Sequence, residues 1–232
     1  MSRVAAPSQA LAPFSLDCRA CPRLAGHLAS VRGAHPEYHA KPVAPFGDAS
    51  PRLLIVGLAP GMHGANRTGR PFTGDYAGIL LYETLHRFGY ASRPDAIAAD
   101  DGLTLSSCRI TNAVKCLPPQ NKPQPDEVRR CNGHLKPELA ALPKSTAILA
   151  LGSIAHQAVL MAYGVRRAAY AFAHAARHML PSGHTLFDSY HCSRYNTQTR
   201  RLTPAMFEQV FSDIAVHLSN EAPQTRGCRR SE

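Results

Sequence analysis

The sequence contains no tryptophan, and aromatic residues make up only 7% of its 232 residues. A large aromatic stacking platform is therefore not expected. No apolar run approaches the roughly 20 residues that a membrane-spanning helix needs. The N-terminus carries one early Arg and no apolar stretch ahead of a cleavage site, so we expect no secretory signal. Together these absences predict a soluble, cytoplasmic protein that does not bind a membrane.

Acidic residues are also scarce, because 16 Asp and Glu stand against 26 Lys and Arg, giving a formal net charge of +10. A basic protein of this size often binds a polyanion, most often nucleic acid. An Arg-rich composition without a specific partner is the alternative, and charge alone leaves both open. The length and the 44% apolar content fit one domain with a substantial core. We expect that domain at residues 16–218, between flexible segments at 1–15 and 219–232, the second of them basic.

Four of the seven cysteines form two widely separated pairs. Cys18 and Cys21 lie in a C-x-x-C near the N-terminus, and Cys116 and Cys131 lie around a Pro-rich stretch. Thiolates bind soft metal centres, and four of them complete either a tetrahedral zinc site or an iron–sulfur cluster. The residue types do not separate these two metals. A disulfide framework is not expected in a reducing compartment.

Four short apolar runs are typical of buried parallel strands. The segments between them carry helical patterns, so strands and helices alternate. Such alternation is typical of an α/β protein, a three-layer α/β/α sandwich with a mostly parallel central sheet. The predicted strands are Leu53–Leu58, Arg109–Val114, Ala147–Leu151 and Thr185–Tyr190, and the predicted helices are Ala77–Phe88, Pro125–Ala141, Gly152–Tyr163 and Pro204–Leu218.

Polar residues gather where three of these strands end. The Gly-rich segment Gly57–Asp75 is too long for a minimal connection, Asn112 lies within the second strand, and His191–Asn196 follows the fourth. Sites in parallel sheets form where loops leave the carboxyl ends of the strands, so we expect these residues to meet at one edge. The signatures G-x-x-x-x-G-K-[ST] and G-x-S-x-G are absent, which disfavours a phosphoryl or acyl-transfer enzyme.

Three motifs resemble the uracil-DNA glycosylase superfamily, most closely its iron–sulfur-containing family 5, often called type b. The segment from Gly57 to Arg70 resembles the first motif of that family. The segment from Thr111 to Cys116 matches one shared with the related family 4, and His191 to Asn196 resembles an H-P-S-x-x-N motif. Cys192 departs from the family, which usually has Pro there, and restores a backbone N–H. The likeness runs from about residue 18 to residue 218, with the motifs in the right order.

The resemblance implies a four-stranded parallel sheet and a [4Fe–4S] cluster on Cys18, Cys21, Cys116 and Cys131, with zinc as the alternative metal. It also implies hydrolysis of the N-glycosidic bond of uracil in DNA, with deaminated purines such as hypoxanthine as further substrates. The abasic site that results would start base-excision repair. The expected partner is DNA that contains uracil or another deaminated base, and we expect the protein to act as a monomer.

Three residues are expected to carry the catalysis. The departing base gains negative charge and the sugar gains oxocarbenium character, so the site needs donors at the base and negative charge near the sugar. His191 matches the motif histidine that faces the leaving base. Asn112 offers a donor and an acceptor to the pyrimidine edge, which would distinguish uracil from cytosine. Asp75 is the candidate for orienting water, and it is equally suited to cap the helix that begins near Ala77.

The remaining site residues are expected to hold the base and the DNA. A base cannot react inside the duplex stack, and Phe72 could stack on one that has flipped out. Arg194 and Tyr195 resemble the loop that enters the minor groove, while Asn66, Arg67 and Arg70 are placed to contact phosphates. The other predicted substrate-binding residues are Gly57, Ala59, Pro60, Gly61, Ser193 and Asn196.

Two function classes remain open on these residues. No lysine in the three motifs is placed to form a Schiff base, so the first class is a monofunctional glycosylase without lyase activity. The second is a metal-stapled α/β module that binds nucleic acid without catalysis. Cleavage at abasic sites after incubation with uracil-containing DNA separates the two.

Overall fold

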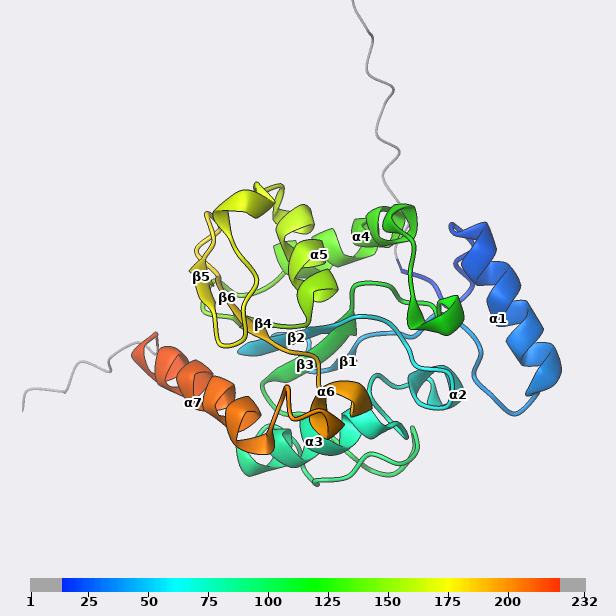
Figure 1. Cartoon of the computed structure of the whole chain (residues 1–232), viewed down its shortest axis with the longest axis horizontal. Helices are drawn as coiled ribbons and strands as arrows, with labels where there is room; N and C mark the ends of the chain where they lie inside the picture. The colour runs from blue at the N-terminus through cyan, green and yellow to red at the C-terminus, as the bar shows by residue number, and fades with distance from the viewer. Residues whose placement is uncertain (1–13, 222–232) are drawn as a thin grey trace, which may run out of the picture.

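The computed structural model describes residues 14–221, in which six strands form one mixed sheet in the order β1-β3-β2-β4-β6-β5 (Figure 1). The two outer strands, β1 (Phe46–Gly47) and β5 (Arg177–Met179), pair antiparallel with their neighbours. The inner strands are parallel, and they are β2 (Leu53–Gly57), β3 (Cys108–Asn112), β4 (Ala147–Leu151) and β6 (Thr185–Ser189).

Helices cover both faces of the sheet, so the predicted three-layer arrangement is confirmed (Figure 1). One face carries α1 (Pro22–Ala34), α4 (Pro125–Ala140) and α5 (Ser153–Tyr163), and the other carries α3 (Tyr76–Arg87) and α7 (Pro204–Asn220). Successive strand residues point to opposite faces, so Leu54 packs into the first core and Ile55 into the second. Burial on both faces explains why the inner strands have continuous apolar sequences.

The prediction of four strands is wrong, because the sheet has six. The four predicted strands are the inner ones, and their ends agree within two residues. The outer strands β1 and β5 contain only two and three residues, and side chains such as Arg177 and His178 form no apolar run. Edge strands this short and polar leave no periodic pattern in a sequence.

All four predicted helices are present, and Thr203 caps α7 by accepting a hydrogen bond from the Met206 amide at 3.2 Å. The sequence analysis missed α1, although Leu24, Leu28 and Val31 are buried at helical spacing. It also missed four short elements in the loops, namely α2 (Ala65–Thr68), α6 (Arg194–Gln198) and the 3-10 turns η1 (Pro119–Asn121) and η2 (Arg167–Ala169).

The ends of the predicted domain stay a prediction. Helix α7 continues to Asn220, two residues beyond the predicted boundary at 218. Residues 1–13 and 222–232, which include most of the two segments predicted to be flexible, lie outside the described part of the chain. Within residues 14–221, no helix combines the length and the apolar character required to cross a bilayer.

Candidate active site

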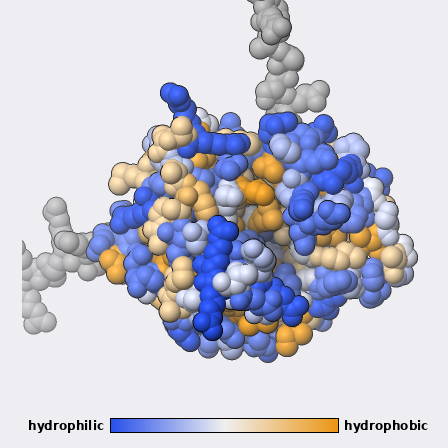
Figure 2. Space-filling model, viewed as in Figure 1, coloured by the Kyte–Doolittle hydropathy of each residue, from blue (hydrophilic) through white to orange (hydrophobic). Residues whose placement is uncertain are grey.

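A cleft of about 1260 Å³ opens at the carboxyl ends of the parallel strands. Figure 2 shows this face of the molecule, with a hollow near its middle, hydrophobic residues beside the hollow and hydrophilic residues around it. The cleft brings together the three segments that the sequence analysis singled out. Its lining includes the predicted residues Ala59, Gly61, Arg67, Phe72, Asp75, Asn112, His191, Ser193, Arg194 and Asn196, but not Gly57, Pro60, Asn66, Arg70 or Tyr195.

Asn112 ends β3 directly beside Gly57, the last residue of β2. Its side chain is buried, and its Oδ1 atom has no hydrogen-bond partner among residues 14–221. A buried acceptor without a partner costs about 1–3 kcal/mol, so a folded protein rarely keeps one without a reason. An N–H group of a molecule bound in the cleft would satisfy this atom.

The ring of Phe72 lies against the same strand ends. A Cβ atom on Gly57 would come within 2.7 Å of this ring, so the absence of a side chain at Gly57 makes room for it. The backbone φ of Phe72 is +54°, in the left-handed region. A residue held there costs about 1–3 kcal/mol, and such strain clusters at functional sites. The structure therefore holds the Phe72 ring at the cleft against a local energetic cost.

His191 follows β6 and faces Phe72, with 5.9 Å between the ring centroids and 28° between the ring planes. Burial lowers the pKa of His191 to about 4, so its imidazole is neutral near pH 7 and retains one N–H to donate. The carbonyl of His191 accepts a hydrogen bond from Asn196 Nδ2 at 2.8 Å. This bond fixes the turn that carries the histidine.

Asp75 caps α3 and also lines the cleft. One carboxylate oxygen, Oδ1, accepts a hydrogen bond from the Gly78 amide at 2.9 Å, so the predicted cap is confirmed. The other oxygen, Oδ2, faces the loop after β2, because a Cβ atom on Gly61 would lie 3.4 Å from it. A Cβ atom on Gly64 would lie 2.7 Å from the Asp75 carboxyl carbon, so this glycine allows the close approach. Burial raises the pKa of Asp75, and its backbone hydrogen bonds oppose that rise.

The segment after His191 turns directly into α6. Ser193 caps this helix, and its Oγ accepts a hydrogen bond from the Asn196 amide at 3.4 Å. The side chain of Cys192 is fully buried in the same core cluster as Phe187 and Leu202. The thiol of Cys192 therefore packs in the core and does not line the cleft.

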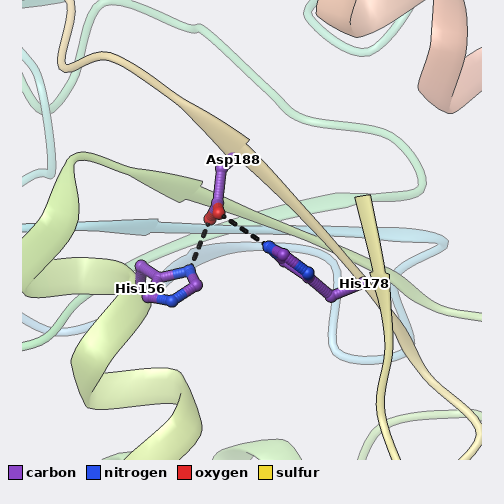
Figure 3. A group of neighbouring side chains, drawn as sticks. All are labelled: His156, His178 and Asp188. Carbon is purple, nitrogen blue, oxygen red and sulfur yellow. Dashed lines mark hydrogen bonds and ion pairs between the residues drawn. The ribbon is translucent and has the colours of Figure 1, made fainter. Parts of the chain in front are cut away.

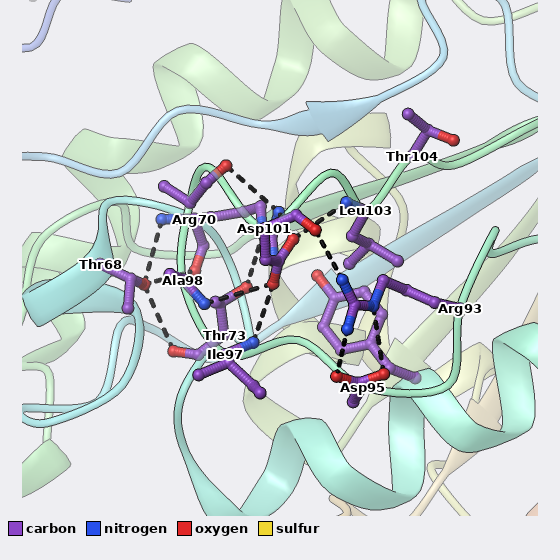
Figure 4. Close-up of polar contacts among 12 residues, drawn as sticks. Thr68, Arg70, Thr73, Arg93, Asp95, Ile97, Ala98, Asp101, Leu103 and Thr104 are labelled. Atoms are coloured by element: carbon purple, nitrogen blue, oxygen red, sulfur yellow. Dashed lines mark hydrogen bonds and ion pairs between the residues drawn. The ribbon is translucent and has the colours of Figure 1, made fainter.

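The structure contradicts the prediction that Arg70 contacts DNA phosphates. The Arg70 guanidinium is buried and binds both carboxylate oxygens of Asp101, at 2.9 and 2.6 Å (Figure 4). This ion pair holds the pKa of Asp101 below its usual range. Asp101 also accepts hydrogen bonds from the amides of Ile97, Ala98 and Leu103. Arg70 therefore fixes the loop that includes Ile97 at the rim of the cleft. Its positive charge is neutralised by Asp101.

Asn66 is a second correction, because its side chain is completely buried and cannot reach a phosphate. Neither Oδ1 nor Nδ2 of Asn66 has a hydrogen-bond partner among the described residues, and nothing in the structure explains this. Arg67 is placed differently, since it lines the cleft and is only partly buried. Its Nε donates a hydrogen bond to the His63 carbonyl at 2.7 Å, and its Nη2 lies against Gly74, where a Cβ atom would come within 2.4 Å of it. A phosphate contact by Arg67 stays a prediction.

Arg194 and Tyr195 begin α6 at the mouth of the cleft. The Arg194 guanidinium lies 5.2 Å from the centre of the Tyr76 ring, a cation–π arrangement. Tyr195 is 70% exposed, and Ile79 and Ile97, which line the cleft, are 54% and 62% exposed. Large apolar side chains clustered at an opening mark an interaction surface.

Sequence reasoning missed the wall of the cleft formed by Tyr190, Phe172 and Arg201. The Arg201 guanidinium lies 4.6 Å from the centre of the Tyr190 ring, and the imidazole of His174 stacks on that ring at 5.1 Å. Phe172 and His174 come from an irregular segment without periodic apolar spacing. Only the position of Tyr190 next to His191 gave a signal in the sequence.

The four cysteines predicted as metal ligands border one small cavity on the α1 side of the sheet. Cys18 and Cys21 lie at the start of α1, Cys116 follows β3, and Cys131 lies on α4. Burial raises the pKa of the Cys116 and Cys131 thiols, the latter to about 11. The Lys115 amide opposes this at Cys131, because it donates a hydrogen bond to Cys131 Sγ at 3.2 Å. Neutral thiols are therefore favoured in this cavity unless a cation is bound there.

A parallel sheet with a polar, aromatic-lined cleft at its carboxyl edge is the arrangement expected of an α/β enzyme. The family profile described as the uracil DNA glycosylase superfamily matches residues 44–215 of the chain, a span that contains every residue of the cleft described above. The chain therefore belongs to the uracil DNA glycosylase superfamily.

Relatives of similar length narrow the assignment. The chain is 47% identical over 203 residues to a type-5 uracil-DNA glycosylase of Thermus thermophilus, with 84% of this chain and 91% of the relative covered. It is 44% identical to the type-5 enzyme of Mycobacterium leprae, with 84% and 89% covered. It is 38% identical to that of Pyrobaculum aerophilum, with 86% and 88% covered. These likenesses are to the type-5 branch over most of the chain.

Proposed function

We propose that the protein is a uracil-DNA glycosylase that hydrolyses the N-glycosidic bond of uracil in DNA and so starts base-excision repair. The observation that carries this proposal is the unpaired Oδ1 of Asn112, buried at the cleft beside the Phe72 ring. Uracil presents an N–H donor at N3, where cytosine presents an acceptor. An unpaired acceptor at this place therefore matches uracil and leaves cytosine without a partner.

The base side of the reaction follows from three side chains. The base must leave the duplex before the enzyme can reach its bond to the sugar. Phe72 supplies an apolar face for the flipped base, and Asn112 reads its edge. His191, neutral because burial lowers its pKa, donates an N–H to a uracil oxygen as negative charge develops there. A neutral imidazole is suited to this task because it can donate a hydrogen bond to the negative charge on the base, and no positive charge has to be kept buried on the histidine.

The sugar side depends on Asp75. Its Oδ1 is used by the helix cap, while Oδ2 faces the loop of Gly61 and Gly64 at the cleft. A carboxylate there opposes the positive charge that grows on the sugar and orients the attacking water. The water that attacks the sugar releases a proton to solvent, and the uracil anion takes up a proton from solvent once it is free, so no further protein group has to change its charge.

The cysteine set fits an iron–sulfur cluster better than a single zinc ion. A tetrahedral zinc with Zn–S bonds of about 2.3 Å places its sulfurs only about 3.8 Å apart. Within residues 14–221, the one group with three ligand atoms inside 4.8 Å of one another is His156, His178 and Asp188, which contains no cysteine. No three of the cysteine sulfurs lie within 4.8 Å of one another in residues 14–221, which supports a [4Fe–4S] cluster on Cys18, Cys21, Cys116 and Cys131. When bound, such a cluster would cross-link α1, α4 and the end of β3, a structural role.

The finer parts of the proposal concern substrate range, assembly and location. We include hypoxanthine and other deaminated bases as candidate substrates, because the cleft is larger than one pyrimidine requires. We also propose that the protein acts as a monomer. The described cysteines are free thiols, which fits a cytoplasmic location. The alternative of a nucleic-acid-binding module without catalysis is not favoured, because the relatives are named as uracil-DNA glycosylases.

The decisive experiment is excision on duplex DNA with one uracil, followed by alkali to cleave abasic sites. We expect strand cleavage by the parent protein, and a strong loss in Asn112→Ala and in His191→Ala at unchanged folding. Parallel duplexes with hypoxanthine and xanthine define the range. DNA binding without any cleavage on these substrates would leave the binding module as the function, and parental rates in both variants would refute this site.

A further inference from the structure

Three titratable side chains form a second buried cluster beside the cleft (Figure 3). His156 comes from α5, His178 from β5 and Asp188 from β6. His156 Nδ1 lies 2.8 Å from Asp188 Oδ1, and His178 Nε2 lies 3.3 Å from Asp188 Oδ2. Asp188 is completely buried and His156 nearly so. None of these residues belongs to the site described above.

The hydrogen-bond partners of His156 define its charge. Its Nδ1 faces a carboxylate oxygen, and its Nε2 lies 3.0 Å from the Tyr170 carbonyl. Both partners are acceptors only, so both ring nitrogens must carry a proton. His156 is therefore an imidazolium that balances the buried charge of Asp188. Breaking such a pair by removing one partner is strongly destabilising, because it leaves the other charge buried.

The cluster holds the wall of the cleft through the segment of residues 170–178. The Tyr170 carbonyl binds His156, and the backbone of Asp188 pairs with Ala175 and Ala176 at 2.9 and 3.0 Å. Within this segment, His174 Nδ1 accepts a hydrogen bond from the Tyr190 amide at 3.2 Å, in addition to stacking on the Tyr190 ring.

Tyr190 directly precedes His191, so this contact reaches the site. The His174 ring lies 5.1 Å from the Tyr190 ring at 22°, and Arg201 approaches the same ring. Ser189, between Asp188 and Tyr190, also contacts His174, with Oγ 3.4 Å from Nδ1. The strand end that carries His191 is therefore anchored at three successive residues by one segment.

We propose that the His156–Asp188 ion pair is a positioning device for the reaction: it fixes residues 170–178 and, through Tyr190, the placement of His191 at the base. This inference rests on the proposed function. His156 does not touch the substrate, so it acts on the rate and not on recognition of the base. A displacement of about 1 Å at a reacting group is enough to lower a rate about 100-fold.

A dependence on pH follows from the same contacts. Burial by itself would lower the pKa of His156, but the hydrogen bond and charge of Asp188 outweigh it, so the pKa is raised. The stabilising pair is thus complete below the ordinary histidine pKa and is lost as the pH rises through the raised value. The groups that face His156 are Asp188, His178 and the Tyr170 carbonyl, while the neighbouring Arg167 of η2 binds Gln157 instead.

The test compares three variants by single-turnover excision and DNA affinity across pH. We expect His156→Ala to lower the excision rate about 10- to 100-fold with DNA affinity unchanged. The excision rate of the parent should fall as the pH rises through the raised pKa of His156. His156→Asn keeps a donor to Asp188 but cannot titrate, so its rate should not show this fall. His184→Ala is the matched control, because His184 is also buried and hydrogen-bonded to Tyr163 and to the Pro143 carbonyl, but at the amino end of β6. It should lose stability and keep the parental rate.

Two further measurements make the outcome decisive. Nitrogen NMR of the parent should find both ring nitrogens of His156 protonated at neutral pH, a result that does not depend on glycosylase activity. Hydrogen exchange of residues 170–178 should accelerate in His156→Ala. Parental rates in His156→Ala at every pH would reduce the pair to a purely structural role. A rise in melting temperature on adding zinc alone, lost in His178→Ala, would instead identify a metal site and overturn the proposal.

Discussion

Gly57 and Asn112 occupy paired positions at the ends of two neighbouring parallel strands, and the missing side chain of the first opens the space beside the amide of the second. A Cβ atom on Gly57 would overlap Asn112 Oδ1 and come within 2.7 Å of the Phe72 ring. The residue at position 57 therefore determines whether the Asn112 amide and the Phe72 ring can border the same small space. That space is where we place the edge of the base.

We predict that Gly57→Ala lowers uracil excision about 100-fold, because the added methyl group displaces the groups that hold the base. The backbone of Gly57 is not in the left-handed region, so the fold should tolerate alanine. Excision rates and melting temperature check this. Gly26→Ala is the control, since a Cβ atom at Gly26 meets nothing within 4 Å. Equal rates for the two variants would mean that the base binds elsewhere.

Asp75→Asn separates the two tasks of this carboxylate. Asn also accepts a hydrogen bond at a helix N-cap, so α3 should stay capped and the melting temperature should hold or rise, since a buried charge is removed. The excision rate should fall about 100-fold, because the charge near the sugar is lost. Asp75→Ala should lose the rate and about 1 kcal/mol of stability as well. An unchanged rate in Asp75→Asn would restrict Asp75 to capping.

The low pKa of His191 predicts how the stability of the protein and its excision rate change at acid pH. The folded protein binds this proton only near pH 4, whereas an unfolded chain binds it near the ordinary value of 6.5. The contribution of His191 to the free energy of unfolding should therefore be complete above that ordinary value and should decrease as the pH falls toward about 4. The excision rate depends on the folded protein alone, so it should stay independent of this histidine until the pH approaches about 4. Denaturant unfolding of the parent and of His191→Gln at several pH values checks this, since the variant should lose that slope.

The contact between Arg194 and Tyr76 predicts a shared contribution to DNA binding. Tyr76→Ala removes the ring under the guanidinium, an interaction of about 0.5–1 kcal/mol at an exposed site, so DNA affinity should fall about 2- to 5-fold. In a double-mutant cycle with Arg194→Ala, the loss of DNA affinity in the double variant should be smaller than the sum of the losses in the two single variants. Val216→Ala, an exposed apolar residue on α7, serves as the control. Strict additivity would show that the two residues act independently.

The cysteine assignment predicts a difference between two buried thiols. Cys116→Ala should lose iron and the absorption of an iron–sulfur chromophore, with a loss of solubility, because a ligand is removed from the shared cavity. Cys108→Ala, from the core of β3, should keep both. Iron analysis and visible spectra of protein purified without oxygen check this. A soluble Cys116→Ala protein with full iron would contradict the ligand set.

Periodicity and motif order were enough to predict the parts of this fold that obey simple rules. Buried parallel strands are apolar throughout, so Leu53–Gly57 and Ala147–Leu151 were found, and their carboxyl ends located the site. Burial of single polar residues was not predictable in this way. Arg70 lies in a loop whose sequence suggests a surface, and only its pairing with Asp101, far along the chain, removes it from the DNA side. The Phe172 and His174 wall was missed for the same reason, since contacts between irregular segments have no period.

The shortness of β1 and β5 has a consequence for how two copies of this chain could associate. An open sheet offers its outermost backbone to any other extended chain, and long flat edges promote aggregation. Here the outer strands span two and three residues, and β5 carries Arg177 and His178. Such edges offer a second copy little backbone to pair with, so association of two copies strand to strand is disfavoured.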